Sequence, residues 1–389
     1  MTLRVLMNVG PWLPVPPRGY GGIENMVAAL VPELRRRGVH VVLATVGSST
    51  LPADERLSVF DEGQFAALLR PYNQVMGVAH AHLQRVAAVL RDRGDIDLVH
   101  DHVEVVGLSV FAAMGRDAPP VLHTLHWDLT KHAELYGGFD GCGRVFVNGV
   151  SAAQLARAPA ALRRHSLGHV HLATPLAVGA DRVPQPAKKD HVVVLGRVSP
   201  GKGQHVAVRL AHRLGMRMVL AGPVGPYHRP EDLHRALDTD PSAVVNPDVR
   251  YWLDEVSPGV DGRLVRWVGT LRGSERDKLV STARAALFPL QWDEPGGTAV
   301  VESLALGTPV VGLRRGCLPE LVRHGSTGLL AVDEEELAEL LPRADDIEPG
   351  RCRQVAAERF TPAVMAEHYL RLYWQVLARS RPRLALLAR

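Results

Sequence analysis

The sequence is short of cysteine and of long apolar runs. Its three cysteines, Cys142, Cys317 and Cys352, cannot all pair and show no CxxC spacing, which argues against a disulfide framework and against a zinc ribbon. No apolar stretch reaches the ~18 residues of a membrane-spanning helix. The opening residues, MTLRVLMNVG, are followed at once by prolines and lack the cleavage pattern of a secretory signal. These absences predict a cytoplasmic protein without an integral membrane segment.

The sequence also has little excess of charge of either sign. The 45 Lys and Arg residues stand against 41 Asp and Glu, which leaves a net charge of +4 and no basic stripe of the kind that nucleic-acid binding needs. We therefore expect no nucleic-acid partner. The bases are almost all arginine, a bias typical of a GC-rich bacterial genome. The lysines are Lys131, Lys188, Lys189, Lys202 and Lys278.

The chain is long enough for more than one domain. Its 389 residues predict two to three domains at about 150 residues each, and 46% hydrophobic residues are enough for ordinary cores. A polar segment with two prolines, residues 179–190, is the best linker candidate. It separates an N-terminal domain, 1–180, from a C-terminal domain, 190–361, and the tail 362–389 is expected to pack back on the N-terminal domain.

Short apolar runs alternate with amphipathic segments, which predicts an α/β fold with parallel sheets. The strands expected in the first half cover residues 3–9, 39–45, 98–101 and 121–125, and the helices 23–37 and 75–91. The strands expected in the second half cover residues 191–195, 218–221, 264–268, 286–289 and 309–312, and the helices 274–284, 298–306 and 362–378. Residues 223–261 show no clean period and are expected to be irregular.

Three glycine-containing loops are candidates for binding an anion. The first places Gly19, Gly21 and Gly22 directly before a helix, where free amides and the helix dipole favour negative charge. It is not a GxGxxG fingerprint, because Glu24 stands where the third glycine belongs. A tight turn that only needs glycine flexibility explains the loop equally well.

The second loop, GRVSPGKG at 196–203, follows an expected strand. It differs from a P-loop because Gly203 stands where Ser or Thr must contact magnesium. Arg197 and Lys202 are instead suited to hold a diphosphate directly, the first by paired hydrogen bonds and the second as a point charge. A solvated surface lysine is the alternative.

The third loop, EPGGTAVVE at 294–302, is the most specific. Glu294 precedes two glycines and Glu302 lies on the helix that follows. Two such carboxylates can accept hydrogen bonds from sugar or ribose hydroxyls, while the amides of Gly297, Thr298 and Ala299 face the ligand. The alternatives are a helix-capping acid for Glu294 and a solvated helix face for Glu302.

A metal site is not expected. His100 and His102 point the same way on an expected strand, but Asp101 between them points to the other face. Two imidazoles alone do not make a metal centre.

Together these segments resemble the retaining glycosyltransferases of family 4. The motifs that carry the resemblance occur in the family's order over most of the chain: GYGGIE (19–24), DLVHDH (97–102), HTLHWD (123–128), LGRVSPGKG (195–203), EPGGTAVVE (294–302) and GTPVVG (307–312). The chain departs from the usual EPFG at Gly296, which replaces an aromatic residue and puts donor-sugar contacts in doubt. The segment AVGAD also departs from the usual NGVD before the linker.

The resemblance implies a GT-B fold, in which two Rossmann-like domains face each other across a cleft. It implies His126, Glu294, Arg197 and Lys202 as catalytic residues, with Glu294 toward the donor sugar and Glu302 toward the ribose. The residues implied to bind the donor are Gly21, Gly22, Gly296, Gly297, Thr298, Ala299 and Glu302.

The implied reaction transfers a sugar from a nucleoside-diphosphate sugar to an acceptor hydroxyl, with retention and without a metal or other cofactor. The acceptor, on a natural product, a lipid headgroup or a glycan, is expected on the N-terminal domain. A nucleotide-sugar epimerase or a sugar phosphorylase on the same fold remain alternatives. A P-loop NTPase and a noncatalytic sugar-nucleotide binding protein fit less well.

Overall fold

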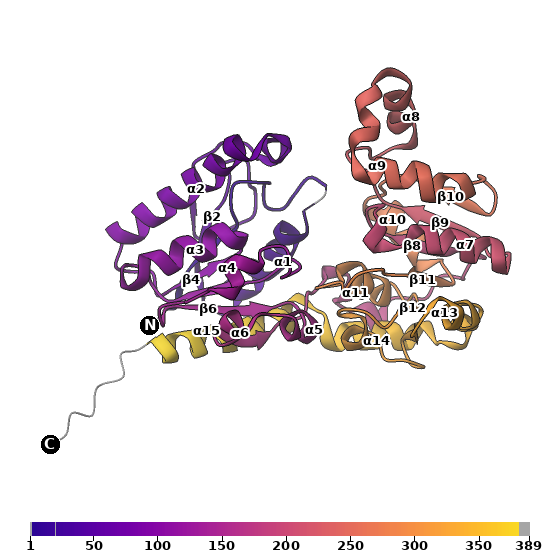
Figure 1. The fold of residues 1–389 in the computed structure, drawn as a ribbon. Helices are drawn as coiled ribbons and strands as arrows, with labels where there is room; N and C mark the ends of the chain where they lie inside the picture. Colours follow the sequence, from indigo (N-terminus) through magenta and orange to yellow (C-terminus); the bar gives the residue numbers. More distant parts are fainter. Residues whose placement is uncertain (1, 20, 381–389) are drawn as a thin grey trace. The chain divides into compact units, whose positions relative to one another are not determined.

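The chain folds into two α/β units, each built on its own parallel sheet (Figure 1). The computed structural model describes residues 2–19 and 21–380, apart from the side chains of residues 69 and 72. Unit 1 contains the described residues up to Ala173 and those from Pro362 onward, and unit 2 is Thr174–Thr361. The expected fold class, two Rossmann-like units with parallel sheets, is confirmed.

Unit 1 has a seven-stranded sheet in the order β3-β2-β1-β4-β5-β6-β7. Its strands are β1 (Arg4–Asn8), β2 (His40–Ala44), β3 (Glu55–Leu57), β4 (Leu98–Asp101), β5 (Val121–Thr124), β6 (Val145–Gly149) and β7 (Ser166–His169). The central strands β1, β4 and β5 are almost entirely buried because helices cover both faces of the sheet, and their apolar residues give way to polar ones toward the carboxyl ends. The register pairs Val5 with Val41 on one side and with Leu98 on the other. The carboxyl ends of β1, β4 and β5 therefore meet at one edge of the sheet.

Helices cover both faces of this sheet. They are α1 (Gly22–Arg36), α2 (Tyr72–Asp92), α3 (Glu104–Met114), α4 (Ala133–Gly137), α5 (Ala152–Ala156), α6 (Ala160–Arg163) and α15 (Pro362–Ser380), with short 3₁₀ turns η1 (Phe65–Leu69) and η2 (Gly115–Asp117). Leu30 of α1 and Tyr369 of α15 share one core, whereas Leu83 of α2 and Phe111 of α3 belong to the core of the opposite face. The last helix thus returns from unit 2 to complete unit 1.

Unit 2 has a six-stranded sheet in the order β10-β9-β8-β11-β12-β13. Its strands are β8 (Val192–Leu195), β9 (Met218–Ala221), β10 (Val265–Trp267), β11 (Ala285–Phe288), β12 (Val310–Leu313) and β13 (Gly328–Ala331). Its α-helices are α7 (Gln204–Leu214), α8 (Pro230–Thr239), α9 (Pro247–Tyr251), α10 (Gly273–Ser281), α11 (Thr298–Ala305), α12 (Leu318–Leu321), α13 (Glu334–Leu340) and α14 (Pro349–Arg359). β8 and β11 are neighbours, so the loops that follow them lie at the same edge.

The expectation of an irregular segment at 223–261 was wrong. Most of it is helical: α8 and α9 are joined by η6 (Pro241–Val245) and followed by the π-helical turn η7 (Trp252–Val256) and by η8 (Ser257–Gly259). Prolines that hid the period stand in the first turn of four of these helices, at Pro230, Pro241, Pro247 and Pro258. Proline is favoured there because the first helical amides have no partner to lose.

The chain passes from unit 1 to unit 2 at residue 173/174, ahead of the segment that the sequence indicated as a linker. Residues 179–190 belong to unit 2 and are tied to it by long basic side chains. Lys188 Nζ donates to the carbonyls of Ser281 and Gly307, and Arg353 donates to the carbonyl of Val183. Residues 179–190 are therefore part of unit 2, although their polar composition and prolines resemble those of a linker.

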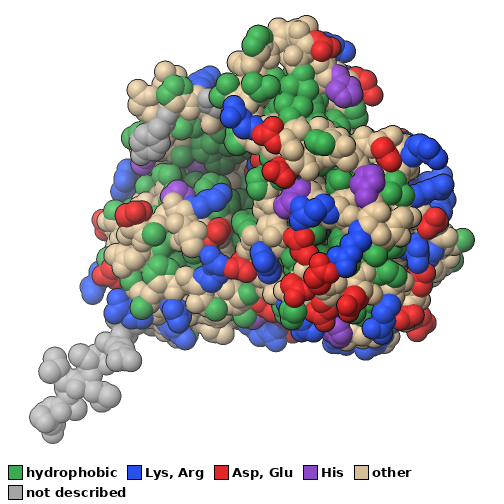
Figure 2. All heavy atoms as spheres, turned by 45° about the vertical axis from the view of Figure 1, so that its right-hand side comes forward, with side chains coloured by type: hydrophobic (Ala, Val, Ile, Leu, Met, Phe, Trp, Pro, Cys, Tyr) green, Lys and Arg blue, Asp and Glu red, His purple; other side chains and the backbone are tan. Residues whose placement is uncertain are grey.

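None of the helices in the described part of the chain has the length and apolar character needed to cross a bilayer. On the face drawn in Figure 2, acidic and basic side chains are interspersed, in keeping with the small net charge.

Candidate functional site

The loop after β8, residues 196–203, is locked to the loop after β11. The amide of Gln291 donates to the carbonyl of Gly201 over 2.8 Å. Gly203 has φ 72, and a Cβ atom there would collide with the carbonyl of Pro289. Only glycine permits this close approach. The second and third of the glycine-containing loops thus form one surface at the carboxyl edge of the unit 2 sheet.

Lys202 and Glu294 meet on this surface although 92 residues separate them. Lys202 Nζ contacts the Glu294 carboxylate, and the two side chains are 27% and 15% exposed. The ammonium also lies 5.4 Å from the ring centroid of Trp292. A half-buried cation beside a carboxylate and an aromatic face is held in place at the site expected for a diphosphate. The sequence did not single out Trp292.

Arg197 lies beside a different acid. Its Nε is 3.5 Å from Asp248 Oδ2, and its side chain is 57% exposed. Burial raises the pKa of Asp248, and the neighbouring Arg197 charge opposes that rise. The structure thus places Arg197 on the same loop as Lys202 but with its own carboxylate partner. Nothing in the sequence pointed to Asp248.

The amino end of α11 supplies the backbone amides of the third loop. Gly297 is left-handed at φ 62, and none of the described side chains caps the helix. A Cβ at Gly297 would collide with Cys317 and Leu321, so this position requires glycine. Gly296 is buried beside it. The amides of Thr298 and Ala299 open the helix, where an anion is favoured.

Glu302, one turn further along α11, lies beside Arg276 of α10, with Arg276 Nη1 3.3 Å from Glu302 Oε2. Its side chain is 21% exposed, so the alternative of a solvated helix face does not hold. Burial raises the pKa of Glu302, and the charge of Arg276 opposes the rise. Arg276 is a neighbour that the sequence did not reveal, because no pattern marks it among the charged residues of α10.

In unit 1, His126 follows β5 at the carboxyl edge of the sheet. Its Nε2 lies 2.9 Å from His102 Nδ1. Burial, assisted by the charge of His123, lowers the pKa of His126 to about 3. His126 is therefore neutral near pH 7 and is suited to hydrogen bonding rather than to carrying a charge.

A buried polar network underlies His126. His123 Nδ1 lies 2.6 Å from Asp101 Oδ2, with both side chains 0% exposed. Asn8 Nδ2 donates to Asp101 Oδ1 over 2.7 Å, and His82 contacts Asn8 in turn. Burial lowers the pKa of His123, but the charge and hydrogen bond of Asp101 and the charge of Glu104 together outweigh this, so the pKa is raised overall. The network fixes the ends of β1, β4 and β5 beneath the candidate acceptor side.

Next to His126, Trp127 is 43% exposed. Its backbone is nonetheless held, because the side-chain amide of buried Gln154 donates to the Trp127 carbonyl over 2.8 Å. The Trp127 ring stacks with His132 at 6.1 Å between centroids, and Lys131 Nζ lies 5.6 Å from the Trp127 ring centroid. An exposed indole on a fixed backbone is a surface on which a ring can pack.

Two sequence families match the two units. The model of Glycosyltransferase Family 4 matches residues 20–160, and that of Glycosyl transferases group 1 matches residues 180–353. Together they include both the His126 region and the loops that carry Lys202 and Glu294. The chain is a glycosyltransferase of the group 1 and family 4 type.

Named relatives agree with this family. The glycosyltransferase is 28% identical over 376 residues to D-inositol 3-phosphate glycosyltransferase of Mycolicibacterium smegmatis, which covers 87% of this chain and 82% of the relative. It is 24% identical over 421 residues to the enzyme of the same name from Acidothermus cellulolyticus, with coverages of 91% and 83%.

Solved structures agree on the fold. AviGT4, a glycosyltransferase involved in avilamycin A biosynthesis, has a TM-score of 0.62 at 26% identity and covers 97% of this chain and 98% of its own. A sucrose-phosphate synthase from Thermosynechococcus elongatus has a TM-score of 0.66 at 20% identity, covering 97% and 100%. The GT-B fold class of the glycosyltransferase follows.

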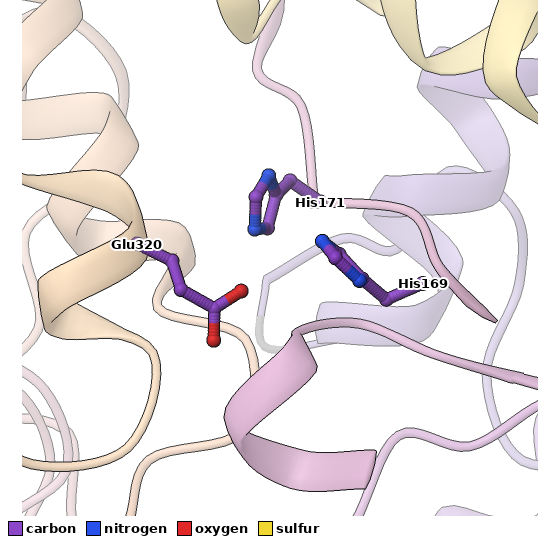
Figure 3. Close-up of side chains that lie close together, drawn as sticks. All are labelled: His169, His171 and Glu320. Atoms are coloured by element: carbon purple, nitrogen blue, oxygen red, sulfur yellow. The ribbon is translucent and has the colours of Figure 1, made fainter. Parts of the chain in front are cut away.

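Several histidines of the glycosyltransferase lie close together in unit 1. Both ring nitrogens of His100 are engaged, one by Tyr373 and one by Thr124, each at 2.8 Å. His169 and His171 stand with ring centroids 4.8 Å apart (Figure 3). Glu320, also labelled there, belongs to unit 2, and two imidazoles of unit 1 alone fall short of a metal site.

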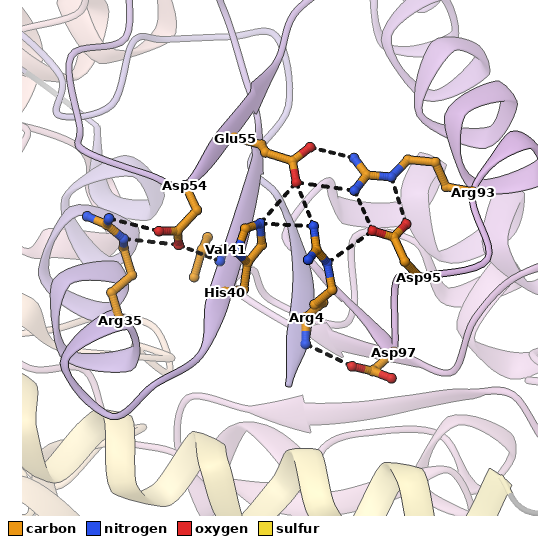
Figure 4. Close-up of polar contacts among 9 residues, drawn as sticks. All are labelled: Arg4, Arg35, His40, Val41, Asp54, Glu55, Arg93, Asp95 and Asp97. Atoms are coloured by element: carbon orange, nitrogen blue, oxygen red, sulfur yellow. Dashed lines mark hydrogen bonds and ion pairs between the residues drawn. The ribbon is translucent and has the colours of Figure 1, made fainter. Parts of the chain in front are cut away.

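A cluster of charged residues at the amino edge of the unit 1 sheet is structural. Glu55 at the start of β3 joins Arg4, His40 and Arg93, and Asp95 pairs with Arg93 at 2.7 Å (Figure 4). Hydrogen bonds from Arg93 and His40 lower the pKa of Glu55 to about 2. These side chains link the first residues of β1, β2 and β3, at the edge of the sheet opposite His126.

The first glycine loop surrounds a buried acid. Gly21 ends the loop with φ 156, and its Cβ position is 2.8 Å from Pro17, whereas Gly22 has open space. Sterics therefore require glycine at Gly21 but not at Gly22. Glu24, in the first turn of α1, is 6% exposed. Burial raises the pKa of Glu24 to about 7, with a small opposing effect from a backbone hydrogen bond.

We expect Glu24→Gln to remove a pH dependence of stability. Because the folded-state pKa lies above the ordinary value of 4.5, the wild-type protein loses stability as the pH rises from about 4.5 through 7. The variant, which cannot ionise, should be more stable than wild type by up to about 3 kcal/mol at pH 8 and nearly equal to it at pH 4. Urea unfolding across this pH range measures the difference. A constant difference would contradict the assignment.

Proposed function

We propose that this glycosyltransferase transfers a sugar from a nucleoside-diphosphate sugar to an acceptor hydroxyl, with retention at the anomeric carbon and without a metal ion. The observation that carries the donor assignment is the meeting of Lys202 with Glu294 next to the uncapped start of α11. Cation, carboxylate and free amides are the groups that a diphosphate and a sugar require.

In this proposal the bond between the sugar carbon and the diphosphate oxygen breaks, and a bond from that carbon to the acceptor oxygen forms. The acceptor proton leaves with the departing diphosphate. Lys202 and Arg197 neutralise the charge that grows on the diphosphate, and the amides of Thr298 and Ala299 add to this. Glu302 holds the ribose and Glu294 the donor sugar. Retention rests on the family resemblance.

The identity of the donor base can be tested by stabilisation. A ligand at 100 times its Kd stabilises the folded state by about 2.7 kcal/mol. Thermal unfolding with UDP, GDP, ADP and dTDP should therefore raise the melting temperature for one of the four well above the others. If none of them stabilises the protein, the donor proposal fails.

If the enzyme needs no metal, turnover should not depend on divalent ions. The proposed charge neutralisation uses Lys202, Arg197 and backbone amides, so no divalent ion is required for departure of the diphosphate. Turnover should stay within about twofold on addition of EDTA and on return of magnesium or manganese. A loss of turnover in EDTA that one of these metals restores would contradict metal independence. Comparing products with and without acceptor separates transfer from the epimerase and phosphorylase alternatives.

We place the acceptor at unit 1, beside His126. The fixed and exposed Trp127 ring supports an acceptor with a ring whose face packs on indole, and Lys131 beside it supports an anionic substituent. The relatives are named for D-inositol 3-phosphate, a phosphorylated ring, which makes inositol phosphates the first acceptors to assay. Trp127→Ala should raise the KM for the acceptor and leave donor affinity unchanged. An unchanged acceptor KM would remove Trp127 from the acceptor site.

A further inference from the structure

A basic groove lies at the amino edge of the unit 2 sheet, opposite the edge that carries the donor loops. It has a volume of about 700 Å³ and is lined by the segments that lead into β8, β9 and β10 and by α10. Its basic side chains are Lys189, Arg217, Arg263, Arg266 and Lys278. The loops with Lys202 and Glu294 follow the carboxyl ends of β8 and β11, so the groove is separate from the proposed donor site.

None of the five basic side chains has a hydrogen-bond or ion-pair partner within residues 2–19 and 21–380. Other bases of unit 2 are paired: Arg209 with Glu334 at 2.7 Å and Arg213 with Glu335 at 2.7 Å. The lining contains two acids, of which Asp190 already faces Arg284 at 3.5 Å. Glu275 is left against five positive charges. Like charges gathered in a concave surface repel one another and raise the local potential for an anion.

The basic side chains of the groove come from four separate segments of the chain and converge on one concave surface. Lys189 lies before β8, Arg217 before β9, Arg263 and Arg266 on either side of the start of β10, and Lys278 on α10. Two of the five lysines in the whole sequence, Lys189 and Lys278, are among them. A run of charge on one solvated helix face would not converge in this way.

The backbone under these side chains is fixed. The Lys189 amide donates to the carbonyl of Thr282 over 2.7 Å. Asp261 Oδ1 accepts from the amides of Arg263 and Leu264 over 2.9 and 2.8 Å, which tightens the turn before β10. On the sheet, Arg266 stands opposite Val219 of β9. Half-buried apolar side chains form the floor: Val219, Leu264, Leu271 and Leu279.

We propose that this groove binds a small ligand that carries two or more phosphate charges. The volume falls within the range of about 300–1,000 Å³ that small-molecule sites occupy. A concave site with bases around it encloses a compact polyanion, whereas a membrane or a nucleic acid needs a flat or extended basic face. The apolar floor accommodates the carbon skeleton between the phosphates. This proposal is independent of the donor assignment.

The probe is inorganic pyrophosphate, titrated calorimetrically at low salt. Because the donor loops are also expected to bind it, the titration is carried out in an Arg197→Ala/Lys202→Ala background. The groove is then altered by adding Arg217→Ala and Arg266→Ala. The matched control adds Arg91→Ala and Arg164→Ala, two exposed arginines of unit 1 that remove the same charge.

The background protein and the control should bind pyrophosphate with equal affinity, and the groove variant should bind at least about tenfold more weakly. All four altered side chains are exposed, so circular dichroism and melting temperature should match. Equal binding by the groove variant and the control, or no binding by the background protein, would overturn the proposal.

The same phosphate chemistry exists on free metabolites and on lipid headgroups. Glucose 1,6-bisphosphate titrated in solution represents the first source, and sedimentation with vesicles of phosphatidylglycerol and phosphatidylcholine in equal parts represents the second. Binding of the soluble ester that depends on Arg217 and Arg266, without binding to vesicles, supports a metabolite site. Vesicle binding that depends on the same arginines, without binding of the ester, would overturn the assignment to a small ligand.

Discussion

Lys202→Ala should lower turnover by roughly 100- to 1000-fold, the usual cost of removing one preorganised charge donor from a site where negative charge develops. Lys202 is half-buried, held between the Glu294 carboxylate and the Trp292 ring, and no second lysine stands on its loop. Water that replaces its ammonium would be less well placed to neutralise the leaving diphosphate. Nucleoside diphosphate released from the donor per enzyme per second measures the effect.

Two further variants separate chemistry from folding. Lys202→Arg keeps the charge and should recover part of the rate. Arg209→Ala removes an exposed base of α7, in the same unit, that pairs with Glu334 away from the loop, and should leave turnover unchanged. The melting temperature of Lys202→Ala should stay close to that of wild type. Near-normal turnover in Lys202→Ala would remove this residue from the donor site.

Asp101→Ala should be the most destabilising of the substitutions considered, by about 3–5 kcal/mol, because it leaves one partner of a fully buried charge pair without the other. Asp101 accepts from His123, Asn8 and the amide of Val103. All of these groups are buried at the ends of β1, β4 and β5. Urea unfolding followed by tryptophan fluorescence and by circular dichroism measures the loss.

Asp95→Ala is the matched control in the same unit. Asp95 also pairs with a base, Arg93, but its side chain is 45% exposed and water can replace the partner. Its substitution should leave the unfolding midpoint almost unchanged. A small effect of Asp101→Ala, similar to that of Asp95→Ala, would show that the buried network does not hold the strand ends together.

Apolar runs were sufficient to predict most of the inner strands, but β6, an inner strand with the sequence VFVNG, was missed. The expected bounds of β4 and β9 agree with the structure: β9, MVLA, is a short apolar run, and β4, LVHD, begins with two apolar residues. The edge strand β3, with the sequence ERL, has no such run and was missed. β7 was also missed, since its residues, SLGH, are mixed in character. Edge strands face water on one side and therefore carry a weaker signal.

Candidate site residues could be recognised in the sequence, but only folding shows their partners. Glycines and the scarce lysine pointed to Lys202 and Glu294, and the structure brings these two together across 92 residues. Asp248 and Arg276 stand far from any motif, so no local pattern could pair them with Arg197 and Glu302. Local spacing encodes which groups are available, and the order of the parallel strands decides which of them meet.

The most direct test of the donor assignment is amide hydrogen exchange with and without the nucleoside diphosphate that stabilises the protein. We expect slower exchange in residues 196–204 and 296–299, the two loops assigned to the donor. Protection confined to unit 1, for example at the glycine loop before α1, or protection at neither unit 2 loop, would contradict it.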